Sequence, residues 1–240
     1  MSAVPRLYID QDLAAGVAVA AGPDQSHYLT RIMRLKAGDA VLLFNGRDGE
    51  WRAVIEAADK RQAVLLPQTR TRPQDDGAAG PWLAFAPVKK TGTDFIVQKA
   101  TELGAARLMP VLTRNGQSER LNRDRLAATA VEASEQCERL SVPAVDDIVT
   151  LPALLEAWPG NRTLYVLDET GGGAPLAAAL AAGPAGFLVG PEGGFQPGEL
   201  DLAAARPFAM RVTLGRRILR AETACLAALA VWQALAGDWK

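Results

Sequence analysis

Two glycine-bearing loops hold the residue types that could bind a ligand in this sequence. The first, residues 190–194, reads GPEGG, and the second, residues 215–220, reads GRRILR. Each follows a short apolar run that predicts a buried strand. Glycine permits positive φ and a close approach of the backbone to a ligand. Because open α/β sheets bind ligands at the carboxyl ends of their strands, the two loops predict a binding site at that edge.

The first loop lacks the pattern of the common phosphate-binding loops. No Gly-Lys-Ser/Thr follows its glycines, and the GxGxxG spacing of dinucleotide sites is also missing. This argues against a regulator that holds a nucleotide phosphate here. Spacing alone leaves two interpretations: a ligand site, or two tight connections in an ordinary α/β sheet.

Composition predicts a globular chain with no metal site. The 240 residues are 49% hydrophobic and 22% charged, and the formal net charge of −1 gives no sign of nucleic-acid binding. The two cysteines lack CxxC spacing and are expected to be buried free thiols. The single histidine, His27, excludes most histidine-based metal sites. With no signal peptide, and an apolar run at 174–190 broken by proline and glycine, we expect a cytoplasmic protein with no membrane span.

The second part of the chain must position the two loops. From Trp82 onward strands and helices alternate, which predicts one α/β domain over residues 75–240. Thr93 is expected to cap a helix over 94–103, and residues 175–182 to form an alanine-rich helix. The expected strands are 82–88, 107–112, 163–167, 187–189 and 212–214, and the closing helix is 221–235.

Residues 1–74 have the pattern of a small β-barrel. Short strands are expected at 6–9, 40–44, 51–57 and 63–66. Asn45-Gly46 is a strong hairpin signal, and a short helix is expected over 25–33. The stretch 69–81, rich in proline, glycine and aspartate, is expected to be a linker with the domain boundary near residue 75.

Four stretches together resemble the SPOUT class of methyltransferases. They are LVGPEGGF from Leu188, LGRRILRAETA from Leu214, HYLTRIMRLKAGDAVLLFNG from His27 and KKTGTDFIVQKATELGAARLMPV from Lys89. Within that class, nearly the whole chain is similar to the family that methylates N3 of a uridine in bacterial 16S ribosomal RNA. The resemblance implies a PUA-like β-barrel that binds RNA, an α/β domain with a carboxyl-terminal trefoil knot, and S-adenosylmethionine as cofactor. Arg216 stands where a proline is expected in the family.

The resemblance assigns the cofactor to the two glycine-bearing loops and the strand end at Leu167. Apolar side chains would form walls for the adenine, and the acid Glu192 would lie near the cationic sulfonium. A solvated loop acid or a helix-cap partner is the alternative for Glu192. Gly193 is expected to need close backbone approach and positive φ. The expected cofactor-binding residues are Leu167, Gly190, Glu192, Gly193, Gly194, Leu214, Gly215, Ile218, Leu219, Arg220 and Thr223.

Arg220 and Glu222 are the expected catalytic residues. N3 of uridine is a weakly acidic imide, so its methylation requires loss of a proton and stabilisation of negative charge on O2 and O4. The guanidinium of Arg220 can stabilise that charge. The carboxylate of Glu222 can take the proton or hold the arginine in place. The alternative is a structural pair at the start of the last helix.

Basic residues in both parts are expected to contact RNA. Arg31 and Arg34 are three residues apart, so a helix places them on one face, and the run from His27 to Arg34 matches the family's His-x-x-x-Arg-x-x-Arg. A solvated polar face is the alternative. The expected RNA-binding residues are His27, Arg31, Arg34, Lys36, Lys89, Lys90, Arg114 and Arg120.

The expected partners are 16S rRNA of the small ribosomal subunit and a second copy of the chain. Helix 221–235 is apolar nearly all round, which predicts burial on more than one side. SPOUT proteins are homodimers that pack through this region. The competing hypothesis is a non-catalytic RNA-binding protein that keeps only the barrel's function, and the intact loop motifs argue against it.

Overall fold

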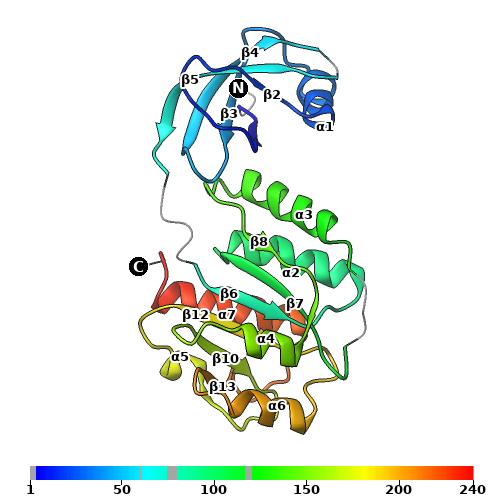
Figure 1. Cartoon of the computed structure of the whole chain (residues 1–240), viewed down its shortest axis with the longest axis vertical. Helices are drawn as coiled ribbons and strands as arrows, with labels where there is room; N and C mark the ends of the chain where they lie inside the picture. The colour runs from blue at the N-terminus through cyan, green and yellow to red at the C-terminus, as the bar shows by residue number, and fades with distance from the viewer. Residues whose placement is uncertain (1–3, 60, 75–79, 117–120, 240) are drawn as a thin grey trace. The chain divides into compact units, whose positions relative to one another are not determined.

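The chain divides into two compact units in the computed structural model, which describes residues 4–59, 61–74, 80–116 and 121–239 (Figure 1). One unit contains residues 1–77 and 134–142, and the other contains 78–133 and 143–240. The expected boundary near residue 75 falls outside the described residues. No pattern in the sequence predicts that residues 134–142 join the first unit.

A five-stranded sheet in the order β1-β3-β4-β5-β2 forms the first unit. Its strands are β1 (Arg6–Tyr8), β2 (Val19–Ala20), β3 (Ala40–Phe44), β4 (Glu50–Ala57) and β5 (Val64–Arg72). β1 pairs with β3 in parallel, and the other neighbours are antiparallel. Alternate apolar side chains such as Leu43, Ile55 and Leu65 are buried together with Leu29, so one face of the sheet carries the core.

The β3–β4 hairpin and β5 differ from expectation at their ends. Asn45 and Gly46 lie in a five-residue connection rather than a two-residue turn. The Asn45 carboxamide closes it, accepting from the amides of Arg47 and Asp48 at 2.9 and 2.8 Å. β5 extends to Arg72 because its end pairs with the start of β4. Residues 69–72 are therefore strand rather than linker.

The helix expected over 25–33 changes type along its length. α1 (Pro23–His27) continues as a single π-helical turn, η1 (Tyr28–Ile32). Arg34 then adopts a φ of 57°, and the amide of Leu35 donates to the Leu29 carbonyl at 3.0 Å. Helices often end with one residue in the left-handed conformation, and that residue is usually glycine. Arg34 therefore occupies a strained backbone conformation.

Arg6 holds residues 134–142 within the first unit. Its Nε donates to Glu50 Oε2 at 2.8 Å, and its Nη atoms donate to the carbonyls of Ser134 and Arg139 at 2.8 and 2.7 Å. The guanidinium carbon also lies 3.8 Å from the centre of the Phe44 ring. Because a buried guanidinium needs partners for its donors, these contacts fix the returning segment against β1 and β3.

The second unit is built on a parallel sheet in the order β11-β13-β10-β12-β6-β7-β8, with β9 also beside β7. The central strand, β12, is buried at all its positions, as expected for a strand covered on both faces. The strands are β6 (Trp82–Phe85), β7 (Arg107–Leu112), β8 (Ala144–Val145), β9 (Val149–Thr150), β10 (Thr163–Leu167), β11 (Ala174–Pro175), β12 (Ala185–Val189) and β13 (Ala209–Thr213).

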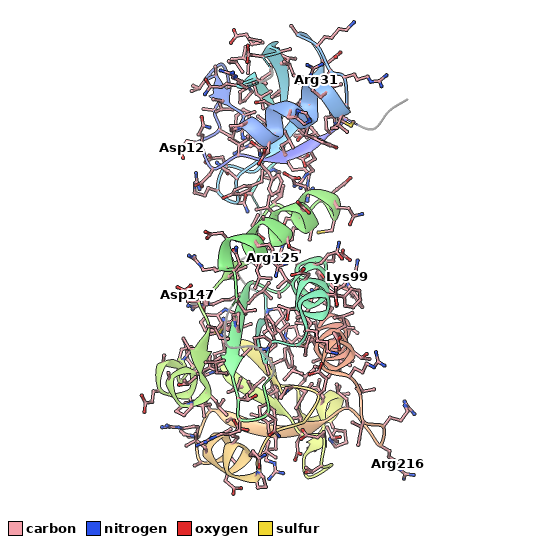
Figure 2. The ribbon with its side chains drawn as sticks, turned by 90° about the vertical axis from the view of Figure 1, so that its right-hand side faces the viewer. Asp12, Arg31, Lys99, Arg125, Asp147 and Arg216 are labelled. Atoms are coloured by element: carbon pink, nitrogen blue, oxygen red, sulfur yellow. The ribbon has the colours of Figure 1, made fainter. Side chains whose placement is uncertain are left out.

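Helices cover both faces of this sheet (Figures 1 and 2). α2 (Lys90–Glu102) packs against α7 (Ala221–Leu235), which lies on β12. On the opposite face α4 (Leu151–Ala157) and α6 (Pro197–Ala204) share a buried apolar cluster with the sheet. α3 (Arg123–Gln136) begins in the second unit and ends in the first.

Three expectations for the helices are wrong. α2 has Lys89 as its N-cap, because the Thr93 hydroxyl bonds to the backbone of Val88 instead. The alanine-rich helix shrinks to α5 (Leu176–Ala179). Cys137 follows the end of α3 and is only half-buried, so it is not a buried helical thiol. Within the described residues, no helix combines the length and apolar character needed to cross a membrane.

Candidate functional site

The ends of β10, β12 and β13 surround one pocket in the second unit. These strands are parallel neighbours, so their carboxyl ends meet at the same edge of the sheet. The first turn of α7 closes the pocket. Its lining residues are Leu167, Asp168, Glu169, Val189, Gly190, Pro191, Glu192, Gly194, Thr213, Leu214, Gly215, Arg217, Ile218, Leu219, Ala221 and Ala224.

Eight of the eleven residues expected to bind a cofactor lie together in this lining: Leu167, Gly190, Glu192, Gly194, Leu214, Gly215, Ile218 and Leu219. The other three lie outside it. Gly193 faces Asn115, since a Cβ added to Gly193 would lie 3.1 Å from that of Asn115. Arg220 is the exposed N-cap of α7, and Thr223 is exposed in its first turn.

The first glycine-bearing loop needs glycine at a different position from the one expected. Gly194, not Gly193, has positive φ, at 66°. A Cβ at Gly194 would overlap Oε1 of Glu169, the atom that accepts a hydrogen bond from the Phe195 amide at 3.0 Å. A Cβ at Gly190 would meet the buried Phe195 ring at 3.0 Å. The loop therefore folds tightly over Phe195 and Glu169, with no space for a side chain at Gly190 or Gly194.

The second loop turns sharply and presents an apolar side chain to solvent. Gly215 has a φ of 106°, and its amide donates to the Thr213 hydroxyl at 3.2 Å. Ile218 lines the pocket but is 82% exposed. Arg216 extends away from the body of the unit in Figure 2. This loop therefore leaves apolar surface free at the mouth of the pocket, where a ligand could cover it.

Asp168 is a buried acid in the lining that motif matching did not select. Its carboxylate accepts from Nε and Nη2 of Arg211 at 2.9 and 2.5 Å, and from the amide and hydroxyl of Thr170 at 2.9 and 2.7 Å. Burial favours its neutral form, but the hydrogen bonds from Thr170 and Arg211 outweigh burial and hold the pKa of Asp168 below its usual range. An ionised Asp168 thus ties the end of β10 to β13.

Arg220 and Glu222 do not form an ion pair with each other among the described residues. Glu222 Oε2 is buried without a hydrogen-bond partner in the part of the chain that the structure describes. Its other oxygen lies against α2, since a Cβ at Gly92 would be 2.7 Å from Oε1. Neither side chain lines the pocket. Glu222 instead lies where the first turns of α7 and α2 meet.

The basic residues expected to contact RNA are exposed wherever their side chains are described. His27, Arg31, Arg34 and Lys36 are exposed in the first unit. Figure 2 shows the Arg31 side chain on the segment that contains α1 and η1. Tyr28 and Ile32 beside them are 39% and 62% exposed, which gives this segment a mixed basic and apolar surface.

In the second unit the expected RNA-binding residues are spread over two segments. Lys89 is exposed at the N-cap of α2, and Lys90 is the first residue of that helix. Arg114 is exposed after β7, and its amide donates to Glu199 Oε1 at 2.9 Å. Arg120 lies outside the described residues.

The chemistry of the pocket suits a ligand with an apolar ring system and a cationic centre. Leu167, Leu214 and Leu219 offer apolar surface. Glu192 lines the pocket and has no hydrogen-bond or ion-pair partner among the described residues, so its carboxylate is available to a cation. In the described ranges, no cluster of three or more histidine, cysteine or acidic side chains is placed to hold a metal ion.

Comparison with known proteins places this chain among RNA-modifying enzymes. Residues 81–233 match the RNA methyltransferase domain family, and residues 21–68 match the RNA methyltransferase PUA domain. The chain is 34% identical over 230 residues to Ribosomal RNA small subunit methyltransferase E of Rickettsia conorii, an alignment that covers 94% of this chain and 93% of the relative. The chain belongs to the ribosomal RNA small subunit methyltransferase E family.

Two further members of the methyltransferase E family agree in sequence and fold. The Synechocystis protein is 35% identical over 218 residues, covering 88% of this chain and 71% of the relative. The crystal structure of the Neisseria gonorrhoeae protein, bound to S-adenosyl methionine, superposes with a TM-score of 0.90 at 28% identity and covers 99% of this chain and 100% of that chain. The expected family, the α/β fold with a parallel sheet and the PUA-like module are confirmed.

Proposed function

We propose that this chain transfers a methyl group from S-adenosylmethionine to N3 of a uridine in 16S ribosomal RNA of the small ribosomal subunit. The observation that carries the proposal is the pocket at the ends of β10, β12 and β13, in a chain of the methyltransferase E family. Support for the cofactor comes from the Neisseria gonorrhoeae relative, which is bound to S-adenosyl methionine.

The pocket residues fit this cofactor in shape and charge. When bound, S-adenosylmethionine would supply an electrophilic methyl carbon on a cationic sulfur, and the carbon–sulfur bond would break as the uridine nitrogen bonds to that carbon and the neutral thioether leaves. Leu214 and Leu219 would hold the adenine between apolar surfaces, and Gly190 and Gly215 would bring backbone groups close to it. The carboxylate of Glu192 would lie near the positive charge. Gly193, Arg220 and Thr223 remain proposed cofactor contacts although they lie outside the lining, with Arg220 contributing its backbone rather than its guanidinium.

Arg220 is proposed to stabilise the negative charge that develops on the uracil oxygens. It is exposed at the start of α7, beside lining residues Leu219 and Ala221, so its guanidinium is free to meet a substrate. Arg220→Ala should retain cofactor binding and lower methyl transfer roughly a hundredfold or more, as for other lost donors to a developing anion. Transfer at the parent rate, on free RNA and on assembled subunits, would show that Arg220 is structural.

Glu222 remains the second proposed catalytic residue. Its buried Oε2, which has no hydrogen-bond partner among the described residues, is the proposed proton acceptor. Its place against Gly92 makes a role in fixing α7 to α2 the competing explanation. Glu222→Gln keeps the shape of the side chain but removes the carboxylate. A rate that stays at the parent level at every pH in this variant would remove Glu222 from the chemistry.

The basic residues are proposed to bind the RNA, with residues 1–74 as the PUA-like domain and 75–240 as the methyltransferase domain. The exposed side chains of His27, Arg31, Arg34 and Lys36 support this for the first domain, and Lys89, Lys90, Arg114 and Arg120 are proposed for the second. Replacing both Arg31 and Arg34 with alanine should weaken RNA binding, flatten its salt dependence and leave cofactor affinity unchanged. An unchanged salt slope would assign both to a solvated surface.

The active form is proposed to be a cytoplasmic homodimer whose methyltransferase domain contains a trefoil knot. Partly exposed apolar residues support the dimer: Phe95 on α2 is 43% exposed and Leu235 on α7 is 49% exposed. Light scattering should report twice the chain mass of 25.4 kDa. A stable monomer at micromolar concentration would rule the dimer out.

The proposed knot is a separate feature of the methyltransferase domain. The position of β10 between β12 and β13 in the sheet is compatible with the knotted threading of the SPOUT class.

Calorimetry with two ligands tests the proposed cofactor. The full chain should bind S-adenosylmethionine and should not bind ATP, because the glycine-bearing loop lacks the lysine that holds phosphates. Binding of ATP alone would overturn the proposed function. Binding of neither would leave an RNA-binding protein without chemistry, which also contradicts it.

A further inference from the structure

We infer that Asn115 is a positioning residue that holds the first glycine-bearing loop in its cofactor-binding conformation. The inference rests on the proposed function of the pocket. Asn115 follows β7, and its Nδ2 donates to the carbonyls of Gly193 at 2.9 Å and Gly194 at 3.0 Å. Its Oδ1 accepts from Nε2 of Gln196 at 2.9 Å. One carboxamide therefore holds two residues of the loop with its donor end and Gln196, just beyond the loop, with its acceptor end.

The loop needs such support because its own residues give it little rigidity. Adjacent glycines have the widest choice of conformations, so ordering them costs more entropy than ordering other residues. Inside the loop, the Gly194 amide donates to the Pro191 carbonyl at 2.9 Å. Glu169 holds the next residue through the Phe195 amide. Among the described residues, the carbonyls of Gly193 and Gly194 accept from Asn115, which lies outside the loop.

Glu199 links the segment that contains Asn115 to the segment that follows the loop. Its Oε1 accepts from the amide of Arg114, the neighbour of Asn115, at 2.9 Å. Its Oε2 accepts from the amide of Gln196 at 2.9 Å. A single carboxylate at the start of α6 thus joins the segment after β7 to the segment after the glycines. Because these bonds are to an ionised group, they are stronger than neutral ones.

Asn115 acts on the pocket through the loop and not by direct contact. Gly194 lines the pocket, whereas Asn115 and Gly193 do not. A loop that is already ordered loses less entropy when a ligand binds, so preorganisation raises affinity. Asn115 should therefore govern cofactor affinity. It should have little influence on the methyl-transfer step, which takes place after the cofactor has bound in the pocket.

Calorimetry with S-adenosylmethionine on the full chain tests this inference. Asn115→Ala removes three neutral hydrogen bonds, so we expect a dissociation constant at least about tenfold higher. Asn115→Asp has the same size but no donors and places a carboxylate against two carbonyls, so we expect a larger increase. The KM for the cofactor should rise by the same factor, while kcat at saturating cofactor and the KM for RNA stay within about twofold of the parent.

Asn122→Ala is the matched control in the same unit. Asn122 Oδ1 accepts from the Arg125 amide at 2.9 Å at the start of α3 and takes no part in the pocket. Loss of this cap should lower the melting temperature without changing cofactor affinity. An effect of Asn115→Asp on affinity that Asn122→Ala does not share separates positioning from general destabilisation.

The outcomes distinguish this inference from the proposed function. If the parent protein does not bind S-adenosylmethionine, the proposed function fails. If the parent binds and Asn115→Asp binds within about twofold of it, the role of Asn115 is wrong. A fall in kcat at saturating cofactor would also overturn it. If neither Asn115 variant folds, Gln196→Ala removes only the donor to Oδ1 and should weaken binding about threefold, and an unchanged affinity in that variant refutes the inference.

Discussion

Gly194→Ala tests whether the pocket depends on a backbone conformation that only glycine adopts easily. Gly194 has a φ of 66°, and a Cβ there would overlap Oε1 of Glu169. The left-handed conformation costs an alanine about 1–2 kcal/mol. Displacing Glu169 from the Phe195 amide, now 3.0 Å away, costs about 1 kcal/mol more at this partly buried site. The total of about 2–3 kcal/mol opposes the native loop.

This cost should appear mainly as lost affinity for the cofactor. The loop can relax in the free protein, but it must return to its native conformation when the cofactor binds. Even about 2 kcal/mol corresponds to roughly thirtyfold weaker binding of S-adenosylmethionine by calorimetry. The control is Gly198→Ala in α6, where a Cβ meets nothing within 4 Å and φ is ordinary. That change should leave affinity unaltered and raise stability slightly. Affinity of Gly194→Ala within threefold of the parent would refute the reasoning.

Three further perturbations have expected outcomes. Arg34→Gly should relieve the positive φ of 57° and stabilise the fold by up to about 1 kcal/mol in urea unfolding, yet weaken RNA binding; a variant that binds RNA as well as the parent would contradict an RNA contact. Arg211→Met should cost about 3 kcal/mol at pH 7 because it leaves a buried charge on Asp168. The pKa of Asp168 in the folded protein lies below its unfolded value of about 4. The stabilisation by the Asp168–Arg211 pair is therefore present above about pH 4 and is lost as the pH falls through the folded pKa. The free energies of unfolding of the parent and the variant should converge in acid. Burial first, and then the charge of Glu222, raise the pKa of the Cys225 thiol, so iodoacetamide should label Cys137 alone in the folded protein; two labels by mass spectrometry would contradict this.

Patterns in the sequence located the elements that position the pocket, although β12 and β13 begin two and three residues before their expected starts at 187 and 212. β10 and α7 have the expected bounds, because β10 is a short apolar run that stops at Asp168 and α7 is a long apolar run that ends before Gly237. The α/β alternation also predicts that the two glycine-bearing loops meet, since parallel strands align their ends. Eight of the expected cofactor residues lie in one pocket for that reason.

Features that depend on contacts between distant segments were beyond such patterns. Asn115 bonds to a loop 78 residues away, and no local spacing marks it. The buried pair of Asp168 and Arg211 joins β10 to β13 across 43 residues. Such pairings follow from tertiary packing, which overrides local preference. The role of Thr93 was missed for a local reason: it looks like a helix cap in sequence, but its hydroxyl bonds to the backbone of Val88, five residues earlier.

Methyl transfer to isolated small ribosomal subunits tests the central claim most directly. Subunits that lack the modification, and free 16S RNA, should be incubated with the full chain and S-adenosylmethionine, and the nucleosides then separated by liquid chromatography and mass spectrometry. The account predicts 3-methyluridine with the parent protein and at least a hundredfold less initial rate with Arg220→Ala. Methylation of another base, or of the ribose, would contradict the proposed chemistry, as would the absence of any methylated nucleoside from both substrates.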